Sequence, residues 1–188
     1  LQSSLEEILS EKRLQYRSKV KVHIEGNFHS GFGLFSNVNN TSLKRIISNL
    51  VNNSVEALHD GAGKISLTLR RENDFAIIEI QDNGTGIPSR VLAQFGQEGI
   101  TYGKEENKDS GQGIGIHHAI KTINSWGGNL HFESEEHIGT TAIISLPLTT
   151  TPTWFLAKIK LNESQTVVIL DDDHEIHHVW DEKLKNFP

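Results

Sequence analysis

An amphipathic helix in the first third of the sequence places the strongest constraint on the fold. From Leu43 to Leu58 the apolar residues recur three or four positions apart and form one continuous stripe. The polar cluster at 39–42 offers N-caps for this helix, and Gly61 and Gly63 follow its end. A helix with one apolar stripe covers another layer of structure, which the rest of the chain has to supply.

Strand-like segments on both sides of the helix can form that layer. Val20, Val22 and Ile24 alternate with polar residues, and the segments 65–69 and 75–80 predict a hairpin. A helix over about 116–126 and strands around 130–132 and 141–146 follow. Several strand faces are half polar, as in a sheet that is covered on one side only. We therefore predict an α+β fold, a two-layer α/β sandwich in which helices lie on one face of a mixed sheet.

Length and composition exclude several classes of protein. The 188 residues suit one domain with extensions, and a net charge of −6 argues against a nucleic-acid binder, which needs a basic face. Without cysteine the chain has no disulfide, thiolate metal site or cysteine nucleophile. No apolar run approaches the ~20 residues of a membrane helix. We expect a cytoplasmic chain without membrane contact, and a membrane anchor elsewhere in the full-length protein is left open. The absence of Met indicates a piece of a longer protein.

Three asparagines lie on the polar side of the helix. Asn49, Asn52, Asn53 and Glu56 lie opposite the apolar stripe, and Asn53 stands about 40° from Asn49 around the helix axis. Asparagine is a poor helix former, so three within five positions call for a reason. One interpretation is a solvated polar face. The other is a row of side-chain oxygens that binds phosphates and a hydrated Mg²⁺, which prefers a few oxygen ligands plus waters.

Three glycine motifs follow in the sequence. Asp82–Gly86 comes after a predicted strand, and its carboxylate can accept a hydrogen bond from an exocyclic amine. Gly111–Gly115 opens a helix, where exposed N–H groups can bind phosphate. Gly139 and Thr140 begin the last predicted strand. Each motif alone is equally compatible with an ordinary turn or loop, and none matches a Rossmann or Walker fingerprint.

The order of these four pieces resembles the GHKL ATPase superfamily, which has the Bergerat ATP-binding fold. Within it, the chain resembles the catalytic ATP-binding domain of a sensor histidine kinase. The resemblance covers about residues 17–148 and rests on the asparagine segment 49–53, the motifs 82–86 and 111–115, and Gly139-Thr140.

The resemblance implies roles for individual residues. Asn53 would bind the Mg²⁺ that bridges the phosphates, with Asn49 in support as the second catalytic residue, and Asp82 would contact the adenine amine. Residues 89–110 would form a lid over ATP, with Phe95 as the lid phenylalanine. The implied nucleotide-binding residues are Asn49, Asn53, Asp82, Gly84, Gly86, Ile87, Lys104, Gly111, Gly113, Ile114, Gly115, Thr140 and Thr141.

The residue at position 49 separates subfamilies. Hydrolysing members carry a glutamate there as the base for water, and an asparagine cannot act as a base. The resemblance therefore implies phosphoryl transfer to a histidine on a helical dimerisation domain, followed by a downstream response regulator, in a protein that is a homodimer at full length. A departure is Glu56, where many histidine kinases have a basic residue. The alternatives are an ATPase that acts by hydrolysis and a silent nucleotide-binding regulatory module.

We divide the chain at two positions. Residues 1–16 are expected to end the dimerisation domain, 17–148 to form the ATP-binding catalytic domain, and 149–188 to form a linker and a truncated receiver-like tail. Trp154 and Phe155 are expected to dock the linker as core. In the tail, 167–173 resembles the first strand of a receiver domain. The segment 174–178 matches the H-E-x-x-H zinc motif, but no third ligand is obvious, and we give this interpretation little weight.

Overall fold

The computed structural model describes residues 1–18, 21–92, 114–155, 166 and 168. The chain divides into two compact units, Leu1–Phe155 and Leu156–Pro188. Several predictions lie outside the described residues. They concern Phe95 and most of the proposed lid, Lys104, Gly111, Gly113, and the receiver-like and zinc-motif segments of the tail.

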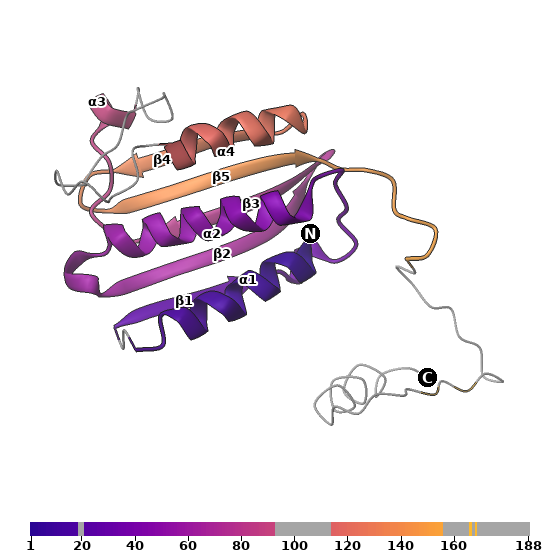
Figure 1. Ribbon diagram of the computed structural model, residues 1–188, viewed down its shortest axis with the longest axis horizontal. Helices are drawn as coiled ribbons and strands as arrows, with labels where there is room; N and C mark the ends of the chain where they lie inside the picture. Colours follow the sequence, from indigo (N-terminus) through magenta and orange to yellow (C-terminus); the bar gives the residue numbers. More distant parts are fainter. Residues whose placement is uncertain (19–20, 93–113, 156–165, 167, 169–188) are drawn as a thin grey trace. The chain divides into compact units, whose positions relative to one another are not determined.

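The first unit is a five-stranded mixed sheet with helices on one face, which confirms the predicted fold class (Figure 1). The strand order is β1-β2-β3-β5-β4, and only β1 and β2 run parallel. The strands are β1 (Val22–Asn27), β2 (Gly63–Glu72), β3 (Phe75–Asp82), β4 (Asn129–Glu135) and β5 (Gly139–Pro147). The helices are α1 (Gln2–Gln15), α2 (Asn40–Ala57), α3 (Ser89–Leu92) and α4 (Ile114–Ser125), with short 3-10 turns η1 (His29–Gly31) and η2 (His59–Gly61).

Helix α2 forms as its sequence predicts. The Asn39 side chain caps it by accepting a hydrogen bond from the backbone N–H of Ser42 at 2.9 Å. Its apolar stripe is buried against the sheet, where every second residue of the central strands points toward the helices. The buried residues of the stripe are Leu43, Ile46, Ile47, Leu50, Val51 and Val55.

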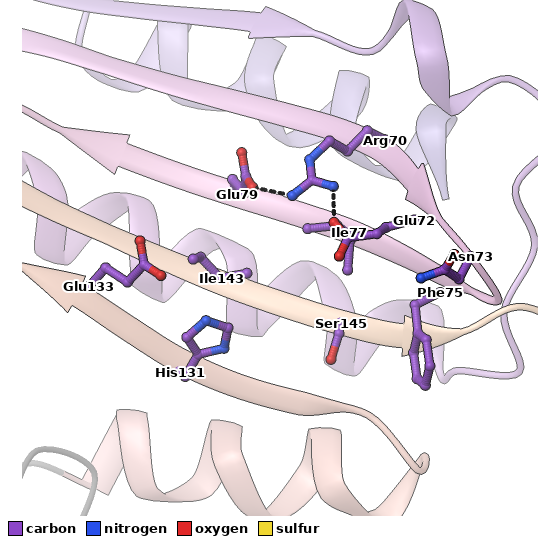
Figure 2. A pocket seen from close by; sticks show the side chains of 10 residues that line it. All are labelled: Arg70, Glu72, Asn73, Phe75, Ile77, Glu79, His131, Glu133, Ile143 and Ser145. Atoms are coloured by element: carbon purple, nitrogen blue, oxygen red, sulfur yellow. Dashed lines mark hydrogen bonds and ion pairs between the residues drawn. The ribbon is translucent and has the colours of Figure 1, made fainter.

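The opposite face of the sheet carries no helix in the described part of the chain and is mostly polar (Figure 2). Arg70 on β2 donates to Glu79 on the neighbouring strand at 2.8 Å and also pairs with Glu72. Phe75 and Ile143 lie among these polar groups and line a shallow groove of about 360 Å³. This face shows the alternation that sequence analysis assigned to a sheet covered on one side.

Helix α1 packs into the same core. Leu5, Ile8 and Leu9 are buried in the cluster that also contains the α2 stripe. By packing, α1 therefore belongs to the unit Leu1–Phe155. Whether the same helix also ends a dimerisation domain stays a prediction.

The segment after β5 docks on the loop that follows β1. The N–H of Thr149 donates to the carbonyl oxygen of Phe35 at 2.8 Å, and the Phe155 ring lies 4.9 Å from the Phe35 ring, centroid to centroid. Trp154 is 74% exposed, so its assignment to the core was wrong: its ring contacts the rings of Phe35 and Phe155 in near-perpendicular arrangements.

Candidate functional site

The helix-covered face of the sheet becomes polar at one end. Asp82 ends β3, Thr140 stands opposite it on β5, and Ser134 stands opposite Thr140 on β4. Farther along the strands, the same face carries apolar residues such as Ile80 and Ala142. Three polar side chains thus form one cross-strand row where the apolar core ends.

Asp82 is the most deeply buried of the three, with 6% of its surface exposed. Its Oδ1 accepts hydrogen bonds from the backbone N–H groups of Gly84 at 3.0 Å and Thr140 at 3.2 Å. Burial raises the pKa of the Asp82 carboxyl, and the hydrogen bonds from Gly84, the Ser54 hydroxyl and Thr140 oppose that rise. A carboxylate has about four acceptor positions, so three donors leave it able to accept a hydrogen bond from a ligand.

The loop after Asp82 is held between two elements. The Thr85 N–H donates to the carbonyl oxygen of Ala57 at the end of α2 at 2.9 Å. The Thr85 carbonyl oxygen accepts from the N–H of His137, between β4 and β5, at 2.7 Å. These bonds fix the loop on both sides before any ligand binds.

This double contact explains the two glycines of the loop. A Cβ on Gly84 would lie 2.4 Å from the Ala57 carbonyl oxygen. Gly86 has φ +65°, and a Cβ there would lie 1.9 Å from the carbonyl oxygen of Glu135. At both positions the protein's own backbone fills the space that a side chain would need.

The asparagines of α2 divide into two groups. Oδ1 of Asn52 accepts from Nζ of Lys12 at 2.8 Å and from the Tyr16 hydroxyl at 2.9 Å, so this residue joins α1 to α2. Among the residues that the structure describes, the side chains of Asn49 and Asn53 make no hydrogen bond to protein. Their amide oxygens therefore remain available to a ligand or a hydrated cation.

The start of α4 lies beside these free amides. A Cβ on Gly115 would be 3.8 Å from Nδ2 of Asn49. Ile114 begins α4, as the predicted glycine motif before a helix requires. The structure thus brings the asparagine segment and the end of the second glycine motif together.

Thr141 and Ile87 stand apart from the polar row. Thr141 lies on the other face of β5, because successive residues of a strand point in opposite directions and Thr140 occupies the helix-covered face. Its side chain therefore does not join Asp82, Thr140 and Ser134, and its role in the nucleotide site stays a prediction. Ile87 is buried, and its N–H donates to Oγ of Ser134 at 2.8 Å, so its backbone is already committed to β4.

Sequence analysis missed Ser54 and Ser134. Ser54 was read as part of the apolar stripe of α2, and its place as the one hydroxyl in that stripe was the available signal. Ser134 sits at a position of β4 where strand alternation expects an apolar residue. A hydroxyl on the buried side of an element requires a partner, and this criterion would have found both residues.

Comparison with known proteins shows the family of the chain. Residues 38–150 match the family of histidine kinase-, DNA gyrase B- and HSP90-like ATPases, and the chain belongs to that family. The sensor protein DegM of Bacillus sp. (strain B21-2) is 35% identical over 112 residues, which make up 60% of this chain and 28% of DegM. Sporulation kinase A of Bacillus subtilis (strain 168) is 26% identical over 154 residues, 78% of this chain and 24% of the kinase.

A solved structure agrees with the fold. Histidine kinase ThkA in complex with the response regulator protein TrrA matches with a TM-score of 0.64 at 21% identity, over 79% of this chain and 40% of the solved chain. The chain spans about a quarter of the length of the curated relatives it matches. The match to the ATPase family makes residues 38–150 an ATP-binding domain of that family. No helix in the described ranges is long and apolar enough to cross a membrane.

Proposed function

We propose that this domain binds Mg-ATP between α2, α4 and the polar end of the sheet, and transfers the γ-phosphoryl group to a histidine on a helical dimerisation domain. The observation that carries the proposal is the buried Asp82 carboxylate, which keeps an acceptor position for the adenine amine. Base and phosphates would then lie at opposite ends of one site, with Asp82 at the base and Asn49 and Asn53 at the phosphates.

The donor set of α2 fits a magnesium ion. Asn53 would be its protein ligand and Asn49 would support it, since both amides are free of hydrogen bonds within the described part of the chain. Two neutral amide oxygens suit a cation that keeps several of its waters and binds phosphate oxygens as well. When bound, Mg²⁺ would neutralise charge on the phosphates. The protein's own contribution is to hold the nucleotide in position for the acceptor.

Position 49 favours transfer over hydrolysis. An amide cannot take a proton from water, so Asn49 offers no general base at the place where hydrolysing relatives carry one. A downstream response regulator, a cytoplasmic location, a homodimeric full-length protein and a receiver-like segment at 167–173 remain parts of this proposal. The two alternatives are hydrolysis of ATP and regulation by nucleotide binding alone.

Calorimetry with Mg-ATP tests binding, and transfer to a separately supplied helical domain tests the reaction. We expect saturable Mg-dependent ATP binding and acid-labile phosphate on the added domain. Release of free phosphate without such labelling would support hydrolysis instead. Binding without either reaction would support a regulatory module.

A further inference from the structure

The Ser134 hydroxyl is at the centre of a three-way hydrogen-bond junction. Its Oγ lies 2.8 Å from the backbone N of Ile87, 2.8 Å from the carbonyl oxygen of Gly139 and 2.9 Å from Oγ1 of Thr140. It therefore ties the loop after Asp82 to the start of β5. None of the roles assigned above requires this residue.

The chemistry of the partners fixes the direction of each bond. The Ile87 N–H can only donate, and the Gly139 carbonyl oxygen can only accept. A serine hydroxyl has one proton, and that proton goes to Gly139. In the contact between the two hydroxyls, Thr140 must therefore be the donor.

This arrangement determines what Thr140 can offer a ligand. With its proton directed at Ser134, the half-buried Thr140 hydroxyl has only lone pairs left, so it acts as an acceptor. Asp82, its cross-strand neighbour, is an acceptor as well. A base that carries an amine can donate to such a pair, whereas a base with a carbonyl at the same position meets only acceptors.

We propose that Ser134 is a positioning residue that fixes the Thr140 hydroxyl as an acceptor, and that it thereby makes the site select an amino-purine over a 6-oxopurine nucleotide. This inference rests on the proposed binding of ATP at the site. It assigns base selectivity to a serine that acts through its neighbour.

The test compares the dissociation constants of ATP and inosine triphosphate by calorimetry. We expect Ser134→Ala to lower the preference for ATP by roughly three- to tenfold, the range of one neutral hydrogen bond, because a freed Thr140 hydroxyl can turn and donate. Ser134→Thr keeps a hydroxyl and should restore most of the preference. Thermal unfolding establishes whether each variant is folded. If Ser134→Ala is not folded, Ser134→Cys is measured in its place.

A second set of variants, made in a Thr140→Val background, tests whether Ser134 acts through Thr140. Thr140→Val removes the hydroxyl at nearly the same volume and should itself lower the preference for ATP. Adding Ser134→Ala to Thr140→Val should then cause no further decrease. An unchanged preference in Ser134→Ala, or an equal decrease in both backgrounds, would overturn the role of Ser134 while leaving ATP binding intact. Absence of ATP binding by the unchanged chain would instead overturn the proposed function, and this inference with it.

Discussion

The buried carboxylate of Asp82, the proposed recognition group, is also a source of instability. Burial raises the pKa of this carboxyl above its usual value of 3.8. At pH values between the usual pKa and the raised pKa, the Asp82 carboxyl is protonated to a greater extent in the folded chain than in the unfolded chain. The contribution of Asp82 to stability therefore falls as the pH rises through this window, and at neutral pH the domain carries the full cost of a buried charge.

Asp82→Asn should separate stability from binding. The amide oxygen can still accept from Gly84 and Thr140, so we expect no loss of thermal stability at pH 7 and a flatter stability profile between pH 4 and neutrality. ATP affinity should fall by about 1.5–3 kcal/mol, the value of a charge-assisted hydrogen bond. Affinity for inorganic pyrophosphate, which lacks the base, is the control. An equal loss for both ligands would show that the residue acts on the fold or on the phosphates.

Asn53→Ala and Asn52→Ala should have opposite effects. Asn53 makes no described hydrogen bond to protein, and alanine is the better helix former, so its replacement should abolish Mg-dependent ATP binding and leave stability unchanged. Replacing Asn52 removes one hydrogen-bond acceptor from each of Lys12 and Tyr16 and should cost about 1–3 kcal/mol of stability, with Mg-ATP affinity retained. Calorimetry and denaturant unfolding of the two variants measure both quantities. Full Mg-ATP affinity in Asn53→Ala would exclude its role as the metal ligand.

Sequence patterns singled out the candidate ligand-binding residues, but not the hydroxyl side chains that the structure places beside them. Asn49, Asn53 and Asp82 stood out because each residue type is unusual where it occurs. Ser54 bonds to Asp82, and Ser134 accepts from the N–H of Ile87, about thirty and fifty residues away in the chain, and only the folded sheet brings these groups together. The motif that contains Thr140 and Thr141 gives the order of the two residues but not the face of the strand on which each lies.

The contact between α1 and α2 contains a buried lysine. Lys12 is 2% exposed, and its Nζ donates to the side-chain oxygens of Asn52 at 2.8 Å and Gln15 at 2.7 Å. Burial lowers the pKa of this lysine. The unfolded chain therefore binds the proton more tightly, and stability rises as the pH increases from the lowered pKa toward 10.5.

Lys12→Met should remove that dependence on pH. Because methionine fills a similar volume without a buried charge, we expect stability at pH 7 to stay the same or to rise by about 1–2 kcal/mol. Lys44→Met is the matched control, since Lys44 also joins the two helices but pairs with the exposed carboxylate of Glu7. Its replacement should cost less than about 1 kcal/mol. Denaturant unfolding at pH 7 and pH 9.5 measures both, and a large loss in Lys12→Met would show that the charge stabilises the interface.

The elements themselves were predictable wherever one periodicity dominates. The α2 stripe and the β2–β3 hairpin were located from their spacing alone. The apolar residues of α1 also recur at helical spacing, but this spacing does not predict which hydrophobic core the helix packs into. Its packing beside α2 depends on the buried surface of both helices, which a pattern in one segment cannot specify.

The chain as a whole has a nucleotide site but no recognisable acceptor for its phosphate. In the sequence, none of its ten histidines is followed by an acid and soon after by a proline, which is the pattern of the family's acceptor. Phosphoryl transfer depends mostly on positioning, so the isolated chain should bind ATP without labelling itself. Incubation with γ-labelled ATP and analysis of acid-labile phosphate tests this expectation. Stoichiometric label would identify an acceptor within the chain, and His174 would be the first residue to replace.

Because β1 and β2 run parallel, the chain between them must return from one end of the sheet to the other, and α2 is part of that return. The hairpins β2–β3 and β4–β5 join neighbours in sequence, whereas α2 packs on both β2 and β3. Because the proposed site draws on α2, α4 and the strands β3, β4 and β5, nucleotide would bind only the assembled domain. At one hundred times its dissociation constant it would add about 2.7 kcal/mol to the stability of that state, so the amount of folded protein would follow the supply of its own substrate.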